Sequence, residues 1–283
     1  MRNRMVVRID GGLGNQMSQY AFYTKIKRHY PNVNVYADYS TYKKNPVHNG
    51  FELIKIFDIN SSKLPQASFL DIQMSRQEIL GGKIIMQQYA SGYPEDEQLY
   101  ALTDNRSYYF HGTWHSFDYS EVMTELRRDF TFKKGLSEKN QSIKALMDAT
   151  QSVSIHVRRG DYIKEGLDII GKDYYFNAIQ LVQNKCKETK LDYFIFSDDK
   201  EYIHSFFDFI PENQLHIVAG NTGKDSYLDM QLMSSCKHNI IANSTFSYWA
   251  AMLNPNIDKI VVKPFMQTAE RESWNNEGWF RLK

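Results

Sequence analysis

The sequence predicts an α/β fold made of two halves, each a parallel sheet flanked by helices. In the C-terminal half, short apolar runs alternate with longer helical stretches, which is typical of strands joined by crossover helices. The N-terminal half opens with the same pattern, an apolar strand, a glycine-rich turn and a helix within residues 5–29. The polar stretch from Lys134 to Gln141 is the expected crossover, so we expect domains at 1–140 and 141–283.

The individual elements follow from the same two patterns. Short runs of branched and aromatic residues predict strands, and the longer stretches between them predict helices. Asp173 is the expected N-cap of the helix that follows it. Residues 40–80 carry mixed signals and receive no assignment. Strands are expected at 5–9, 33–36, 83–86, 108–110, 153–157, 193–196, 215–218, 239–242 and 259–262, and helices at 16–29, 120–128, 174–187, 200–207, 225–237 and 245–253.

The composition fits a globular protein and restricts the kind of partner. The chain has 283 residues, of which 42% are hydrophobic and 24% charged, enough to form buried cores. A formal net charge of +1 gives no large basic field, which argues against nucleic acid as the main partner. The two cysteines, Cys186 and Cys236, suggest neither a disulfide framework nor a zinc site. We see no signal peptide or membrane-length apolar stretch, so we expect a cytoplasmic protein, at most peripheral to the inner membrane.

The segment at 156–161, His-Val-Arg-Arg-Gly-Asp, is the first candidate for a ligand site. Alternation along the preceding strand turns its apolar residues toward a core and places His156 and Arg158 together on the opposite face. Ligands of open α/β sheets bind beyond the carboxyl ends of strands, where an arginine fork suits a phosphate. Arg159 joins only if the strand breaks at Gly160, which can turn sharply. Surface ion pairs with neighbouring carboxylates are the alternative.

A glycine-rich loop at 11–16, Gly-Gly-Leu-Gly-Asn-Gln, follows the first strand and opens a helix. The backbone N–H groups at such a helix start can hold a phosphate. Gly12 and Gly14 match the first part of a dinucleotide fingerprint, but Met17 occupies the third glycine position, which weakens an NAD interpretation. A tight turn without a ligand is the alternative.

Polar groups also stand at other element ends. Residues 243–247, Asn-Ser-Thr-Phe-Ser, lie between a strand and a helix, where hydroxyls cap the helix or hold a pyrophosphate. Asp229 lies in an otherwise apolar helical stretch, where it either accepts bonds from a guanine edge or lies on a solvated face. Asp198 and Asp199 end a strand and suit a ligand better than a core. The chain has no Asp-x-Asp triplet and no His/Cys cluster with ligand spacing, so no metal is expected.

Taken together, these motifs resemble those of the bacterial α-1,2-fucosyltransferases, glycosyltransferase family eleven. The glycine-rich loop resembles the opening motif of that family, and the basic segment resembles its H-x-R-R-x-D motif. The segment His-Gly-Thr-Trp resembles a further family element, with Thr113 where Tyr is usual. The resembling segments, in chain order, are 11–21, 111–114, 156–162, 229–233 and 244–251.

The resemblance implies a GT-B fold, in which two Rossmann-like domains face a cleft, with GDP-fucose as donor and no cofactor or metal. It also implies that Arg158 and Arg159 bind the β-phosphate, that His156 and Asp229 lie at the guanine, and that Asn15 faces donor and acceptor. Further donor contacts are expected from Gly12, Gly14, Asp199, Ser244, Thr245, Phe246 and Ser247, and acceptor contacts from Trp114 and His115.

The expected reaction inverts the anomeric carbon of fucose. The 2-OH of a terminal galactose in a glycan attacks as GDP leaves, through a transition state with oxocarbenium character. Arg158 stabilises the charge that builds on the β-phosphate. Asp161, or a carboxylate or His115 from the N-terminal domain, is a candidate for a general base, and a path that needs little base is also open. A fucosyltransferase of another linkage or acceptor, and a non-catalytic nucleotide- or sugar-binding protein, are the alternatives.

Overall fold

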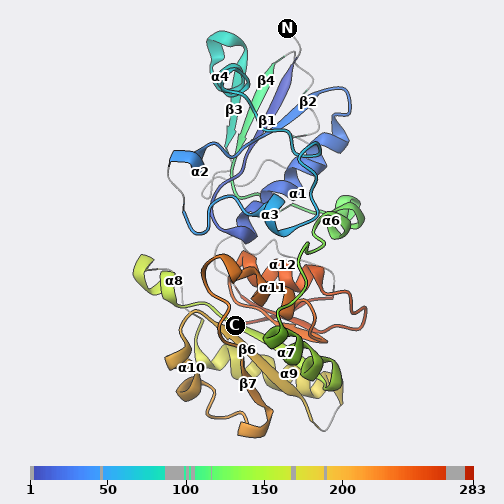
Figure 1. Cartoon of the computed structure of the whole chain (residues 1–283), viewed down its shortest axis with the longest axis vertical. Helices are drawn as coiled ribbons and strands as arrows, with labels where there is room; N and C mark the ends of the chain where they lie inside the picture. The colour runs from blue at the N-terminus through green and yellow to red at the C-terminus, as the bar shows by residue number, and fades with distance from the viewer. Residues whose placement is uncertain are drawn as a thin grey trace. The chain divides into compact units, whose positions relative to one another are not determined.

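The chain folds into two compact units, as drawn in the computed structural model of Figure 1. The structure describes residues 3–44, 47–86, 99, 102, 106–115, 117–166, 170–187, 190–265 and 278–283. The first unit runs to Lys134 and the second begins at Gly135, within the stretch expected to be the crossover. The domain boundary expected after residue 140 lies a few residues farther along the chain. Each unit is built on one parallel sheet.

Unit 1 contains a four-stranded sheet in the order β2-β1-β4-β3. The four strands confirm the N-terminal expectations within one or two residues at each end. The helix after the glycine loop begins at Leu13, ahead of the expected start, and its N-cap Gly12 offers no side-chain hydrogen bond. The elements are β1 (Arg4–Arg8), α1 (Leu13–His29), β2 (Asn34–Asp38), α2 (Thr41–Lys44), α3 (Leu53–Ile56), α4 (Phe69–Arg76), η1 (Glu78–Leu80), β3 (Gly82–Met86), β4 (Ser107–His111), η2 (Ser120–Val122) and α6 (Met123–Asp129).

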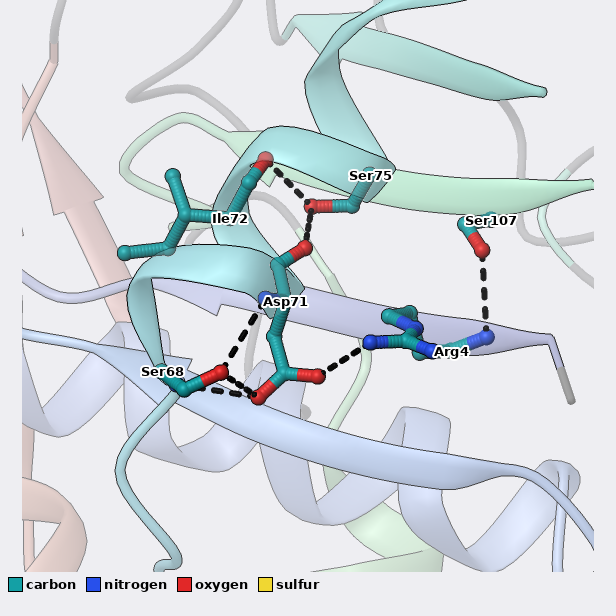
Figure 2. Close-up of polar contacts among 6 residues, drawn as sticks. All are labelled: Arg4, Ser68, Asp71, Ile72, Ser75 and Ser107. Carbon is teal, nitrogen blue, oxygen red and sulfur yellow. Dashed lines mark hydrogen bonds and ion pairs between the residues drawn. The ribbon is translucent and has the colours of Figure 1, made fainter. Parts of the chain in front are cut away.

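The helix α4 is fixed to the sheet at the amino end of β1, as Figure 2 shows. Asp71 pairs with the Arg4 guanidinium at 2.5 Å and forms a capping box with Ser68 at the start of the helix. The backbone N–H of Arg4 donates to Ser107 Oγ of β4, at 3.4 Å. Next to these contacts, Val6 and Tyr109 form a small apolar cluster on the α4 side of the sheet.

Unit 2 contains a six-stranded parallel sheet in the order β10-β9-β8-β5-β6-β7. The expected strands and helices of this half are present, with ends that differ by at most four residues. The sequence did not indicate α7, α8 or the last strand β10. The elements are α7 (Glu138–Ala149), β5 (Ser152–Val157), α8 (Gly160–Glu165), α9 (Lys172–Cys186), β6 (Asp192–Ser197), α10 (Lys200–Phe206), η3 (Glu212–Gln214), β7 (Leu215–Ile217), η4 (Gly223–Asp225), α11 (Tyr227–Met233), β8 (His238–Ile240), α12 (Thr245–Leu253), β9 (Val261–Pro264) and β10 (Phe280–Leu282).

One capping expectation in this half is wrong. Asp173 lies in the first turn of α9, whose N-cap is Gly171, and no side chain caps that helix end. The first-turn position still favours a carboxylate, because the helix dipole places partial positive charge there.

Strand β5 lies in the middle of the unit 2 sheet and is buried along its whole length. Val153, Ile155 and Val157 belong to one cluster with side chains of α9 and α10, as alternation predicts. The opposite face is also covered, because the His156 ring lies 5.9 Å from the Phe246 ring of α12, between centroids. A parallel sheet covered on both faces leaves its carboxyl edge as the natural place for a ligand.

Both sheets have a topological switch point, where the chain leaves one side of the sheet and continues on the other. In unit 2 it lies between β5 and β8, and in unit 1 between β1 and β4. Ligands of doubly wound folds bind at the carboxyl ends of the strands at this point. In the described part of the chain, no helix is both long and apolar enough to cross a bilayer.

Candidate functional site

The switch point of unit 2 brings the predicted arginines next to a pair of aspartates. Arg158 and Arg159 follow the last residue of β5, and Asp198 and Asp199 follow the last residue of the neighbouring β6. Arg158 Nη1 lies 3.2 Å from Asp198 Oδ2, and its side chain keeps 27% of its surface exposed. The guanidinium also lies 5.8 Å from the centre of the Tyr162 ring. A partly exposed guanidinium at a strand end is therefore available to an anionic ligand.

Arg159 is held by a stacking contact and an ion pair. Its guanidinium carbon lies 3.4 Å from the centre of the Tyr202 ring, and its Nε lies 3.2 Å from Asp199 Oδ2. Asp199 is also the N-cap of α10, where its Oδ1 accepts from the Tyr202 N–H at 3.3 Å. Stacking and an ion pair together fix the plane of the guanidinium. The protein itself therefore fixes the orientation of Arg159. Its contact with a phosphate stays a prediction.

Asp198 holds the whole turn in place. Its Oδ1 accepts from the backbone N–H of Arg159 at 3.0 Å, while its Oδ2 faces Arg158. A Cβ on Gly160 would lie 3.1 Å from the same Oδ2, tighter than ordinary contact. Gly160 thus allows the chain to pass close to the carboxylate, and α8 begins there. The strand that was expected over residues 153–157 ends at Val157, and the chain turns into α8 at Gly160.

The start of α12 contributes the other side of this switch point. The Ser244 hydroxyl caps the helix by accepting from the Phe246 N–H at 3.3 Å. Ser247 is buried, and its hydroxyl accepts from the Ala242 N–H and donates to the Ser244 carbonyl. Thr245 and Phe246 remain half-buried. Of the four residues expected to hold a diphosphate, Ser247 is therefore occupied with local structure, whereas Thr245 and Phe246 present surface.

The residues expected at the guanine lie in two different surroundings. His156 is buried within β5, and its carbonyl accepts from the Tyr175 hydroxyl at 3.0 Å. Asp229 lies half-buried in the first turn of α11, where its Oδ1 accepts from the Asn221 amide at 2.7 Å. The same amide bonds Asn140 of α7. Asp229 thus belongs to a polar group at the carboxyl end of β7, and its contact with a base stays a prediction.

The glycine loop of unit 1 follows β1 at the other switch point. Gly11 has a φ of 76°, and a Cβ there would lie 2.8 Å from the Asn15 amide nitrogen, so the position requires glycine. Asn15 is half-buried beside it, while Gly14 is buried in the first turn of α1. The loop packs against its own helix, and contacts of Gly12, Gly14 and Asn15 with a ligand stay predictions.

Two glutamines of the same motif, for which the sequence suggested no role, fix the loops around it. Both side chains are fully buried. Gln19 accepts from the Asp10 N–H at 2.9 Å and donates to Asp10 Oδ1 and to the Gly112 carbonyl, both at 3.0 Å. Gln16 donates to the carbonyls of Gly11 and Gly50. Gln19 therefore connects the loop after β1 to the loop after β4. In the sequence, the only signal for this role was that Gln16 and Gln19 are three residues apart and so share one face of α1.

The two residues expected to bind the acceptor are turned inward. The Trp114 ring is fully buried and stacks on Phe22, with 3.9 Å between centroids. His115 is also buried, and its Nδ1 lies 3.1 Å from the Ser18 hydroxyl. These side chains fill the core beneath the loop and present no ring face on which a sugar could stack.

Two remaining expectations concern a base and a metal. The side chain of Asp161 lies outside the described atoms, so its role stays a prediction. Among the described residues, no group of three or more His, Cys, Asp or Glu side chains is arranged to hold a metal ion. The arrangement at the β5–β8 switch point thus offers cationic and N–H groups suited to an anion, next to carboxylates that orient them.

Comparisons with known proteins identify the family of the chain. The model of glycosyl transferase family 11 matches residues 2–283. An α-1,2-colitosyltransferase of Escherichia coli is 29% identical over an alignment 305 positions long, which covers 99% of each chain. A galactoside α-(1,2)-fucosyltransferase 1 of Homo sapiens is 24% identical over 148 residues, covering 48% of this chain and 40% of that protein.

The fold is shared with solved fucosyltransferases. NodZ from Bradyrhizobium superposes with a TM-score of 0.53 at 16% identity, covering 90% of this chain and 93% of NodZ. A NodZ structure described as an α-1,6-fucosyltransferase soaked with GDP-fucose gives a TM-score of 0.52 at 15% identity, covering 90% and 94%. The α/β fold predicted from the sequence is confirmed, and it is of the GT-B type.

Proposed function

The chain belongs to glycosyl transferase family 11, and on this premise we propose that it transfers L-fucose from GDP-fucose to the 2-OH of a terminal galactose in a glycan. The product is an α-1,2 linkage. The human relative is named for this linkage to galactosides, and a NodZ structure was soaked with GDP-fucose. The proposal extends the coarser fact that the chain is a glycosyltransferase of this family.

One observation carries the proposal, the placement of Arg158 at the β5–β8 switch point. Its side chain is partly exposed. The residue comes directly after the central strand β5, at the same edge of the sheet as the start of α12. A nucleoside diphosphate needs charge-assisted donors at such an edge, and arginine supplies two parallel N–H groups. Asp198 pairs with one of these donors, and the incoming β-phosphate takes its place.

The proposed step is a single displacement at the anomeric carbon. The galactose 2-OH forms the new C–O bond while the bond from that carbon to the β-phosphate oxygen breaks. The hydroxyl proton goes to a base or to water, and GDP leaves with the bonding electron pair. Negative charge grows on the β-phosphate during this step, so a fixed cationic donor there stabilises the transition state more than the ground state. Arg158 supplies this donor, and Asp198 with Gly160 sets its position.

A second donor is supported by the relative that matches the whole chain. That protein is named an α-1,2-colitosyltransferase, and the identity of 29% extends over 99% of both chains. Colitose is L-fucose without its 3-hydroxyl, so the diphosphate and guanine contacts serve both donors equally. GDP-colitose is therefore the competing donor, and only groups at the sugar distinguish the two.

The proposal includes the remaining expectations about setting and chemistry. We propose that the reaction needs no metal ion, since cationic side chains and helix N–H groups can neutralise the leaving diphosphate. We also propose that the protein acts in the cytoplasm, peripheral to the inner membrane, where glycan precursors carry the acceptor.

A donor and acceptor screen tests the proposal. The purified protein is incubated with GDP-fucose or GDP-colitose and a panel of β-galactosides, with and without EDTA, while GDP release and product linkage are measured. We expect α-1,2 transfer from GDP-fucose to a galactoside at the same rate in EDTA. A preference for GDP-colitose supports the second donor, another linkage refutes the assigned acceptor position, and GDP binding without turnover identifies a binding protein.

A further inference from the structure

The carboxyl edge of the unit 1 sheet carries a row of polar side chains on one face. Arg8 is paired in register with Asp38 of β2, and His111 with Met86 of β3. Strands β1 and β4 pair up to Val7 and Phe110, so Arg8 and His111 come next to each other, one residue farther on. Neighbouring strands lie about 4.8 Å apart, which brings the row within reach of one small ligand.

The helix α4 packs over the inner part of this face. Ile72 of α4 packs against Val6 and Tyr109, one step back from the row. The Arg76 guanidinium at the end of α4 lies 5.1 Å from the centre of the Tyr109 ring. Two side chains of the row remain partly exposed. His111 is half-buried, and the Arg8 side chain keeps 28% of its surface exposed.

Asp10 lies just beyond the row and is fixed in place. Its Oδ1 accepts from the buried Gln19 amide at 3.0 Å, and its Oδ2 lies 2.6 Å from Arg8 Nε. Its side chain nevertheless keeps 28% of its surface exposed. A carboxylate has about four lone-pair sites, so each oxygen can still accept a hydrogen bond from a ligand. Asp10 is thus an oriented acceptor at the switch point between β1 and β4.

The charges around this edge balance one another. Arg8 and Arg76 are offset by Asp10 and Asp38, whose Oδ2 accepts from the Tyr109 hydroxyl at 2.7 Å. Burial lowers the pKa of His111, with Arg8 and Arg76 acting in the same direction and Asp10 against it, so the imidazole is neutral near pH 7. A site with no net charge and with both donors and acceptors suits a neutral polyhydroxyl ligand better than a phosphate.

We infer that Asp10, Arg8 and His111 form the subsite that recognises the hydroxyl groups of the acceptor, a neutral galactoside. Two sugar hydroxyls donate to Asp10 and His111, while a free N–H of Arg8 donates to a sugar oxygen. The subsite replaces Trp114 and His115, which the fold has turned into the core. The inference rests on the proposed function for the identity of the acceptor sugar.

Steady-state kinetics of Asp10→Asn and His111→Gln test the inference. Both variants keep the size of the side chain, and Asn can still accept the Gln19 bond. Loss of a hydrogen bond to a charged group costs about tenfold or more in affinity, so we expect the acceptor KM to rise about 10-fold in Asp10→Asn. Donor KM, and hydrolysis of GDP-fucose by water without acceptor, are expected to stay within twofold.

Asp58→Asn is the matched control, because Asp58 is an exposed carboxylate in the same unit. It is expected to leave both KM values unchanged. An acceptor KM within twofold of wild type in both site variants overturns the inference. An equal rise in donor and acceptor KM overturns it as well, because that result indicates general damage to the fold.

Direct binding separates this inference from the proposed function. Saturation-transfer NMR of the GDP-loaded protein with methyl β-galactoside reports acceptor binding without turnover. We expect a signal for wild type and Asp58→Asn, and its loss in Asp10→Asn and His111→Gln. If wild type binds the galactoside but transfers no fucose, the proposed function fails while the subsite is still tested. If wild type gives no signal, or all proteins give the same signal, the subsite is wrong.

Discussion

Removal of the Arg158 guanidinium is the most direct test of the donor site. In Arg158→Ala, the diphosphate loses a charge-assisted donor and meets the Asp198 carboxylate, which had faced Arg158 at 3.2 Å. Loss of one preorganised donor at a developing negative charge costs about 2.7–4 kcal/mol, or about 10²- to 10³-fold in kcat. We therefore expect kcat with GDP-fucose to fall by at least about a hundredfold.

The fold should tolerate the same change. Arg158 and Asp198 are each about a quarter exposed, and an ion pair of this kind contributes at most about 1 kcal/mol. Arg158→Lys keeps the charge but loses the planar fork, so its kcat is expected to lie between those of Ala and wild type. Thermal unfolding followed by circular dichroism should show a small change in Tm for both.

A second ion pair in unit 2 provides the control. Lys172 and Asp208 are 2.5 Å apart, and both side chains are exposed. Lys172→Ala removes a cation from an equally local pair and should leave kcat unchanged. GDP release is measured in a coupled assay at saturating acceptor, over a range of donor concentrations. A folded Arg158→Ala enzyme with kcat within threefold of wild type contradicts the phosphate role.

Three further outcomes follow from the same contacts. Asp198→Asn weakens the hold on the neighbouring arginine turn, so donor kcat/KM should fall about tenfold in the GDP-release assay, with less effect on acceptor KM. Trp114→Ala opens a large cavity and should lower the free energy of unfolding in urea by about 3–5 kcal/mol, while Trp114→Phe keeps the acceptor KM. Although partial burial opposes it, hydrogen bonds from Ser68 and the charge of Arg4 lower the pKa of Asp71; its contribution to stability is therefore full above the ordinary carboxyl pKa of about 4 and is lost as the pH falls through the lower folded value. Asp71→Asn should flatten this acid limb in a plot of Tm against pH, and an unchanged limb contradicts the assignment.

The sheet topology was largely accessible from the sequence, because it depends on local patterns. Strand runs and glycine turns gave both switch-point loops, including the end of β5 before Gly160. Helix starts were less accessible where no side chain caps them, as at Gly12 and Gly171. Helix α7 was missed even though Ser137 caps it, because its sequence is polar and it buries only Asn140 and Met147.

The candidate site was accessible only as a list of residue types. Alternation placed His156 and Arg158 on one face, but it reported neither the burial of His156 nor the partner that holds Arg159. Tyr202 lies on another helix, and its stacking at 3.4 Å is a tertiary contact that no local pattern reports. The same holds for Trp114. Its motif position suggested a sugar contact, whereas its ring packs against Phe22 in the core, a tertiary contact that no local pattern reports.

The two halves use the same physical solution at their switch points. In unit 2, Asp198 at the end of β6 bonds the backbone and side chain of the turn after β5. In unit 1, Gln19 bonds Asp10 after β1 and Gly112 after β4. In each case a side chain with no proposed contact to the substrate fixes a loop by polar contacts with two neighbours. Such residues orient Arg158 and Asp10 before any ligand arrives, and preorganisation of this kind reduces the ordering cost of binding. Substitutions at Asp198 and Gln19 should therefore weaken binding and turnover even though neither side chain is assigned a contact with substrate.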